Sequence, residues 1–332
     1  MKDRFPFKKF LLWLRHRTAE YGLRAFVFLV PRLPHRVLVL MTSAAARLTL
    51  TVLWRYGKYM EENVAMAMND ESLTVERRKT VVRLAWRNFA LGLFETACVL
   101  YAPRDKICAS VAIQGEEHLK RALEKGKGVI ALSAHVGNFT MIGPRLAAAG
   151  YPFSIVVKQP PDQRLARLLN DYRAKVGVKT ILAKPRRQAA RQIIGALRRN
   201  EVVLVIADGF KYGGSVNAEF LGRAVSVRRG PVTLALRTGG AVVPMFVTRD
   251  AEDCLTLRIS SEIDLVKTGD LQQDVAANLA LFIRHLEEMV QGYPDQWYQL
   301  SPQRPPSKNL GPMFPDSVQP GLKLKEVKER RS

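Results

Sequence analysis

The chain has 332 residues, 47% of them hydrophobic, which excludes wholesale disorder because a core of useful size can be buried. Its three cysteines form no C-x-x-C pair, and this excludes a disulfide scaffold and an obvious zinc module. The formal net charge of +22 favours an anionic partner: nucleic acid, anionic lipid or another polyanion.

The first 60 residues combine charge with large apolar side chains. They hold twelve lysines and arginines against Asp3 and Glu20, interleaved with clusters of Phe, Leu, Val and Trp. Pro31 and Pro34 divide the segment into helical pieces. This pattern predicts basic amphipathic helices, 1–60, that lie on an anionic membrane surface. The alternative is ordinary helices packed on the following domain. No uncharged apolar run is long enough to predict a membrane-spanning helix.

In the remainder of the chain, strand and helix patterns alternate as in an α/β fold. Residues 61–103 are expected to be helical, and from residue 128 short β-branched runs alternate with helical runs. Strands are expected at 129–133, 153–157, 178–182, 202–206, 242–247 and 254–259. Helices are expected at 138–149, 163–176, 188–199, 231–237 and 271–290. The alternation predicts a mostly parallel central sheet flanked by helices over residues 61–301. Residues 302–332 are expected to form a Pro-rich, charged tail.

Two polar residues come directly after predicted buried strands. His135 and Asp208 each stand at a strand exit, the place where α/β folds bind ligands. The alternatives are a satisfied buried histidine and an Asx-turn that caps a loop. Gly137 permits close approach, and Asn138 is expected to cap the next helix. The other histidines are expected to be surface or packing residues: His16, His35, His118 and His285.

The segment Ser133-Ala134-His135-Val136-Gly137-Asn138-Phe139 resembles the strand-to-helix block of the lipid A biosynthesis acyltransferase family. These late lauroyl and myristoyl acyltransferases belong to the lysophospholipid acyltransferase-like superfamily. Further blocks resemble the family in the same order, and together they cover about residues 20–303: Glu62-Asn63-Val64, Tyr172-Arg173, Val205-Ile206-Ala207-Asp208, Phe220 to Ala224 with Gly230 to Ala235, and Tyr293-Pro294-Asp295-Gln296-Trp297.

The resemblance implies transfer of a fatty acyl chain from a thioester to a hydroxyl of a membrane glycolipid, with a lipid A precursor as the family's usual acceptor. The donor would be acyl carrier protein or coenzyme A, with no metal or other cofactor. His135 would be the general base, and the site would face the cytoplasm at the bacterial inner membrane. Arg173 and Asp208 would pair and hold the site, with Glu219 as a further catalytic candidate. The substrate-binding candidates are Gly137, Asn138, Thr140, Gly222, Arg223 and Arg187. Backbone amides near Gly137 or Gly222 are candidate oxyanion donors.

One position departs from the family pattern. The family signature is a histidine, four further residues and then Asp or Glu, whereas this chain has Thr140 at that place. Asp208 or Glu219 could supply the carboxylate instead, or the Thr140 hydroxyl could orient His135. The third alternative is a catalytically impaired, lipid-binding relative. Nucleic-acid binding is not expected, because the sequence has no helix-turn-helix, zinc-finger or RNA-recognition signature.

Overall fold

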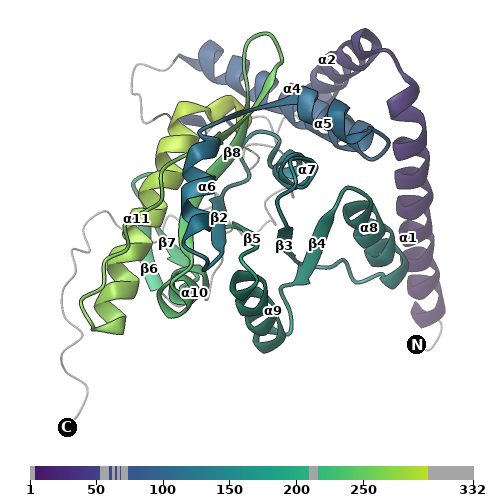
Figure 1. The fold of residues 1–332 in the computed structure, drawn as a ribbon. Helices are drawn as coiled ribbons and strands as arrows, with labels where there is room; N and C mark the ends of the chain where they lie inside the picture. The colour runs from purple at the N-terminus through teal and green to yellow at the C-terminus, as the bar shows by residue number, and fades with distance from the viewer. Residues whose placement is uncertain are drawn as a thin grey trace.

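The computed structural model describes residues 4–52, 60–61, 64–65, 68, 74–208 and 216–297. A seven-stranded sheet stands at its centre in the order β1-β9-β8-β2-β5-β3-β4 (Figure 1). Adjacent strands are parallel except at the β8–β9 pair, which is antiparallel. The strands are β1 (Val111–Gln114), β2 (Val129–Ser133), β3 (Phe153–Val157), β4 (Val178–Leu182), β5 (Val202–Ile206), β8 (Ala241–Arg249) and β9 (Leu255–Ile259).

Helices cover both faces of this sheet, as the sequence predicts for an α/β fold (Figure 1). They are α1 (Arg4–Leu29), α2 (His35–Val52), α4 (Val75–Val99), α5 (Arg104–Ser110), α6 (Glu116–Glu124), α7 (Ile142–Ala148), α8 (Gln163–Lys175), α9 (Arg186–Arg198), α10 (Gly230–Thr238) and α11 (Leu271–Gly292). The described residues also form the 3-10 turns η1 (Val30–Arg32), η2 (Phe139–Met141) and η3 (Pro294–Gln296). A separate hairpin, β6 (Val216–Phe220) with β7 (Arg223–Val227), packs beside α11.

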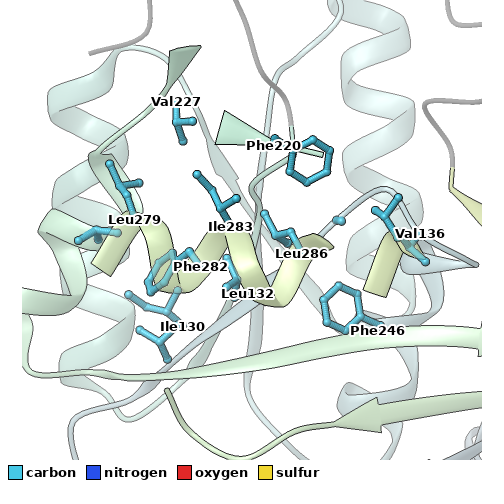
Figure 2. Close-up of a cluster of buried hydrophobic side chains, with 14 of the residues drawn as sticks. Ile130, Leu132, Val136, Phe220, Val227, Phe246, Leu279, Phe282, Ile283 and Leu286 are labelled. Atoms are coloured by element: carbon cyan, nitrogen blue, oxygen red, sulfur yellow. The ribbon is translucent and has the colours of Figure 1, made fainter. Parts of the chain in front are cut away.

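Strand β2 shows why its sequence is a continuous apolar run. All five of its residues are buried, because successive side chains point to opposite faces and both faces are covered. Ile130 and Leu132 pack with α9, α10, α11 and the hairpin, and Figure 2 shows them beside the apolar side of α11. Val129 and Ala131 pack with α5, α6 and α7 on the opposite face. The sheet is therefore the middle of three layers.

The four strands expected at 129–133, 153–157, 178–182 and 202–206 are confirmed at those bounds. No helix or strand is expected in 104–124 from the sequence, yet the structure has α5, β1 and α6 there. Strand β1 has four residues at the sheet edge and only one of them is fully buried, so it lacks the apolar run of an interior strand. The helix expected from Asn138 begins as the 3-10 turn η2.

The N-terminal helices pack on the α/β layers. Pro31 and Pro34 separate α1 from α2, as predicted. Helix α1 lies beside α8 (Figure 1), where the buried Arg17 guanidinium donates to Asp162 at 2.9 Å and also pairs with Glu20. Within the described parts of the chain, no helix is long and apolar enough to cross a membrane. The predicted tail, 302–332, lies outside the described residues, and the predicted domain bounds stay predictions.

Candidate active site

The register of β2 and β5 brings His135 and Asp208 together. The two strands are adjacent and parallel, with Ser133 opposite Ile206. The pairing continues past the end of β5, where the Ala207 N–H donates to the carbonyl of Ser133, the last residue of β2, at 2.8 Å. Two residues after each strand, His135 Nδ1 lies 2.7 Å from Asp208 Oδ1. The two strand exits therefore form one imidazole–carboxylate pair, called the dyad below.

The surroundings of Asp208 determine which tautomer His135 adopts. The Asp208 side chain is fully buried, and its Oδ2 accepts the His135 backbone N–H at 2.9 Å. An ionised carboxylate only accepts hydrogen bonds, so His135 Nδ1 carries the proton and Nε2 carries the lone pair. The His135 side chain is 26% exposed, and Phe139 meets its ring edge-on with centroids 5.0 Å apart. A buried carboxylate that orients a partly exposed imidazole is the geometry of a general base.

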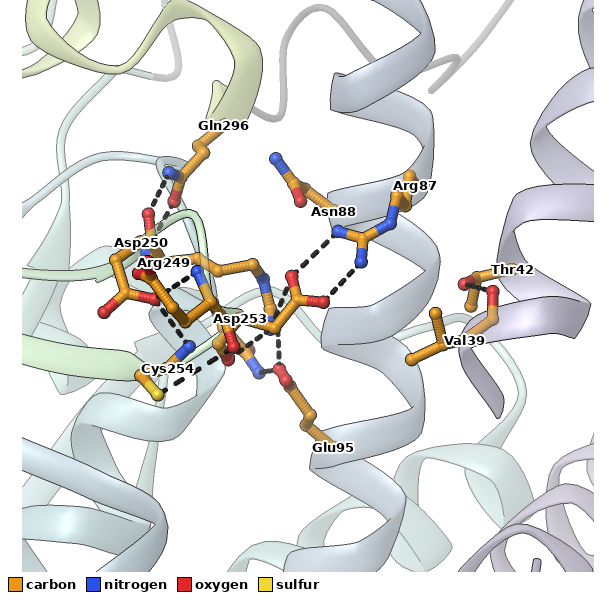
Figure 3. A network of polar contacts seen from close by, with 12 residues as sticks. Val39, Thr42, Arg87, Asn88, Glu95, Arg249, Asp250, Asp253, Cys254 and Gln296 are labelled. Atoms are coloured by element: carbon orange, nitrogen blue, oxygen red, sulfur yellow. Dashed lines mark hydrogen bonds and ion pairs between the residues drawn. The ribbon is translucent and has the colours of Figure 1, made fainter. Parts of the chain in front are cut away.

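The turn at Gln296 and Trp297 holds the segment that follows β2. Trp297 is buried, and its indole Nε1 donates to Asp208 Oδ2 at 3.2 Å. The Gln296 side chain bonds both backbone groups of Arg249, accepting from N at 2.8 Å and donating to O at 2.7 Å (Figure 3). The Gln296 carbonyl accepts the Gly137 N–H at 2.7 Å. One turn from the C-terminal part of the domain thus contacts Asp208, the end of β8 and the loop after His135.

Gly137 lies directly against the backbone of Val247 in β8. Its φ of +57° is in the left-handed region, and a Cβ at this position would lie 1.8 Å from the Val247 carbonyl oxygen. The neighbouring Asn138 N–H donates to that same oxygen at 3.1 Å. The Gly137 N–H is engaged by Gln296, and an oxyanion donor among the amides near Gly137 stays a prediction.

Thr140 bonds away from His135. Its hydroxyl donates to Asn138 Oδ1 at 2.6 Å and lies 2.6 Å from Thr96 Oγ1 on α4. The alternative in which the Thr140 hydroxyl orients His135 therefore has no support, and the carboxylate beside the imidazole belongs to Asp208. The Asn138 side chain makes no cap bond, which corrects the expected role. It donates instead to Glu95 Oε2 at 2.8 Å.

Charged side chains behind the loop pair with one another around the buried Arg249 (Figure 3). The Arg249 side chain is 4% exposed and donates to Glu95 Oε2 at 2.7 Å and to the Asp253 carbonyl at 3.1 Å. The Arg87 guanidinium binds both carboxylate oxygens of Asp253, one of them at 2.8 Å. Glu95 is thus shared by Arg249 and Asn138. Pairing of this kind is what permits a charge to be buried at all, so α4, β8 and the loop after His135 are tied into one unit.

A recess of about 120 Å³ opens between α4 and this loop. Phe89, Leu93 and Phe139 form its apolar wall, whereas Asn138 and Thr140 contribute polar atoms. The dyad lies beside the recess, because Phe139, which lines the recess, also contacts the His135 ring. An apolar recess next to a base suits a substrate that carries hydrocarbon. Among the described residues, no three His, Cys, Asp or Glu side chains gather as a metal site requires.

The other predicted site residues lie elsewhere. Arg173, on α8, donates to Asn170 Oδ1 at 3.0 Å, and burial lowers the pKa of its guanidinium. In the described structure it makes no ion pair with Asp208, so the expected Arg173–Asp208 pair is wrong. Glu219 is exposed on β6, Gly222 lies in the β6–β7 turn at φ +73°, and Arg187 is exposed on the first turn of α9. Arg223 begins β7, and its side chain is outside the described set. The catalytic role of Glu219 and the substrate-binding roles of Gly222, Arg187 and Arg223 stay predictions.

The residues that sequence reasoning missed are Glu95, Arg249, Gln296 and Trp297. Gln296 and Trp297 belong to a block that carries the family resemblance, but nothing in the sequence shows what they contact. Trp297 is 89 positions from Asp208, and Arg249 is 154 positions from Glu95.

Comparisons with known proteins identify the family of the chain. The sequence profile of the bacterial lipid A biosynthesis acyltransferases matches residues 5–303. A phosphatidylinositol mannoside acyltransferase of Mycolicibacterium smegmatis is 28% identical over 188 residues, 56% of this chain and 60% of that protein. The chain thus spans about three-fifths of the length of that relative. A lipid A biosynthesis palmitoleoyltransferase of Escherichia coli is 23% identical over 300 residues, 88% of this chain and 94% of that protein.

Among solved structures, the 1-acyl-sn-glycerophosphate acyltransferase of Thermotoga maritima aligns over 77% of this chain and 98% of that chain, with a TM-score of 0.35 and 14% identity. The lipid A acyltransferase profile, over residues 5–303, includes all of the blocks that carry the resemblance. The chain therefore belongs to the bacterial lipid A biosynthesis acyltransferase family.

Proposed function

We propose that this protein transfers a fatty acyl chain from a thioester to a hydroxyl of a membrane glycolipid, with His135 as the general base. The observation that carries the proposal is the 2.7 Å contact between His135 Nδ1 and Asp208, which leaves the Nε2 lone pair as the proton acceptor. Family membership supplies the class of reaction, and the dyad supplies the group that performs it.

In the proposed reaction, His135 Nε2 removes the proton of the acceptor hydroxyl while that oxygen attacks the thioester carbonyl carbon. The resulting tetrahedral intermediate collapses, the carbon–sulfur bond breaks and an ester forms. The departing thiolate takes the proton back from the imidazolium, so the dyad returns to its starting state. Base catalysis of this kind typically contributes 10²- to 10⁴-fold. Asp208 stabilises the transient positive charge of His135 across the 2.7 Å contact.

The acceptor is proposed from the relatives. The family's name points to lipid A, while the mycobacterial relatives are named for phosphatidylinositol mannosides. Both acceptors are anionic glycolipids with free sugar hydroxyls, so the shared chemistry is the hydroxyl of a phosphorylated glycolipid. A lipid A precursor is the first acceptor that we propose, and a mannosylated phosphatidylinositol is the second. Arg187 and its exposed basic neighbours on α9 are proposed to meet phosphates of the acceptor or an acidic carrier protein.

The N-terminal helices are proposed to rest on an anionic membrane. Helix α2 buries Leu38 beside Ala97 of α4, whereas Leu40 and Leu48 on its outer side are 70% and 66% exposed. Trp13 on α1 is 56% exposed. Outward apolar side chains among basic residues are typical of helices that bind anionic lipid. The cytoplasmic face of the bacterial inner membrane is the proposed location.

The experiment is acyl transfer by the detergent-solubilised full chain. Labelled acyl-carrier-protein and acyl-coenzyme A are each offered with a lipid A precursor and a mannosylated phosphatidylinositol. We expect transfer by the wild type, loss of at least 10²-fold in His135→Ala, and unchanged transfer in His118→Ala, which alters a partly exposed histidine on α6.

Transfer that survives His135→Ala would refute the general-base role. No transfer from either donor by a wild type that still binds the glycolipid would favour the catalytically impaired, lipid-binding relative.

A further inference from the structure

The buried carboxylate of Asp208 is held from two sides. Oδ1 faces His135 Nδ1, while Oδ2 accepts the Trp297 indole N–H at 3.2 Å and the His135 backbone N–H at 2.9 Å. Because the Asp208 side chain has no exposed surface, water cannot replace a missing donor without entering the core. The indole therefore supplies one of the two hydrogen bonds recorded at Oδ2.

Trp297 is itself held in a rigid frame. It is 1% exposed, its ring lies 5.9 Å from that of Phe220 between centroids, and its backbone forms an antiparallel bridge with Val136. The preceding Gln296 bonds both backbone groups of Arg249. An N–H on such a frame has a fixed direction, in contrast to a donor on a mobile surface side chain. The frame also links the end of β8 to the dyad.

We propose that Trp297 is a positioning residue: its indole N–H fixes the Asp208 carboxylate in the orientation that presents Oδ1 to His135 Nδ1. The inference rests on the proposed function, because the dyad matters only if His135 acts as a base. Without this N–H, the His135 backbone N–H is the one donor left to Oδ2 among the described residues, and the carboxylate can turn about its Cβ–Cγ bond. The imidazole then loses its fixed tautomer, so the chemical step slows while substrate binding is unaffected.

The substitution Trp297→Phe removes the N–H, and the chain offers a matched control. Trp86 on α4 is also an indole in contact with the core, and its buried Nε1 has no hydrogen-bond partner among the described residues. A hydrogen bond to a charged group is worth a factor of about 10 to 100. We expect kcat to fall by about that factor in Trp297→Phe with KM unchanged, and both to stay within about two-fold in Trp86→Phe. Equal effects of the two substitutions, or a loss confined to KM, would overturn the proposal.

A double-mutant cycle separates positioning from general packing. If Trp297 acts through Asp208, then Trp297→Phe lowers kcat in the wild type but lowers it no further in Asp208→Asn. If the two substitutions instead lower kcat independently, so that their fold losses multiply in the double variant, Trp297 does not act through Asp208. Phenylalanine also leaves space in the core, so a second variant carries β-(3-benzothienyl)alanine at position 297, which keeps the bicyclic ring and replaces N–H with sulfur. This variant should lose the same factor, and wild-type kcat in it would overturn the proposal.

A substrate-free measurement distinguishes failure of this proposal from failure of the proposed function. In protein labelled with ¹⁵N-tryptophan, the Trp297 indole signal is identified by its absence in Trp297→Phe. Asp208→Asn should shift that signal and leave the Trp86 signal in place. An unshifted Trp297 signal would overturn the positioning contact, whatever the enzyme does. A wild type without acyl transfer, but with the shift present, would overturn the proposed function instead.

Discussion

Replacing Gly137 with alanine tests the close contact between the loop after His135 and Val247 of β8. A Cβ there would lie 1.8 Å from the Val247 carbonyl oxygen, far inside any contact that real side chains make. Val247 cannot easily retreat, because it lies in the buried strand β8 and pairs with Leu257 of β9. The loop must therefore move away from β8, and this movement separates the Gly137 and Asn138 N–H groups from their acceptors.

The size of the effect follows from these contacts. An alanine in the left-handed region costs about 1–2 kcal/mol. The Gly137 N–H bond to Gln296 and the Asn138 N–H bond to Val247 contribute about 0.5–1.5 kcal/mol each. The free energy of unfolding should fall by about 2–5 kcal/mol in total, which is a large share of the stability of an ordinary domain.

Urea denaturation of Gly137→Ala beside Gly126→Ala measures this loss. Gly126 has a φ of +68°, but an added Cβ would meet nothing within 4 Å, so the control carries only the backbone strain. We expect the difference between the two variants to equal the contribution of the two hydrogen bonds, about 1–3 kcal/mol. If Gly126→Ala destabilises the protein as much as Gly137→Ala does, the close approach to Val247 is not what constrains position 137.

Two further predictions concern charges. Arg249→Met leaves the Glu95 carboxylate without its buried partner, and we expect the free energy of unfolding to fall by about 3–5 kcal/mol. Adding Glu95→Gln should recover part of that loss in urea denaturation, and no recovery would argue against the pair. The backbone N–H and the hydroxyl of Thr268 donate to Asp274 and hold its pKa below the usual value. A lowered folded-state pKa stabilises the protein above the unfolded-state pKa, and this stability is lost as the pH falls through the folded-state pKa. Asp274→Asn should therefore flatten the acid limb of Tm against pH, whereas the same change at the exposed Asp264 should not.

The strands of the sheet interior could be predicted from the sequence because burial on both faces selects continuous apolar runs. The segments 129–133 and 202–206 are of this kind and were found at their observed bounds. The edge strand β1 is short and only one of its four residues is fully buried, so it does not stand out in the sequence. Strand direction was also hidden, because the apolar pattern of β9 gives no sign that it runs antiparallel to β8.

The site could be predicted in part for a related physical reason. Parallel neighbours end at the same edge of a sheet, so His135 and Asp208 were visible as two strand exits. The Arg173 expectation was wrong because helical position alone does not show which neighbour a side chain meets. The role of Trp297 depends on a contact that only the folded chain creates, 89 positions away.

The central claim is that Asp208, and not residue 140, supplies the carboxylate that serves His135. Both oxygens of Asp208 accept hydrogen bonds, whereas an asparagine at 208 has only one accepting oxygen. If its NH2 group takes the place of Oδ2, it faces two N–H donors. If the NH2 group takes the place of Oδ1, it favours the imidazole tautomer with the proton on Nε2. The corresponding change in a serine-protease triad lowers kcat by about 10⁴. The most direct measurement is kcat for acyl transfer in Asp208→Asn and Thr140→Val side by side. We expect a loss of that order in Asp208→Asn and less than about ten-fold in Thr140→Val. A large loss in Thr140→Val with near wild-type turnover in Asp208→Asn would contradict the claim.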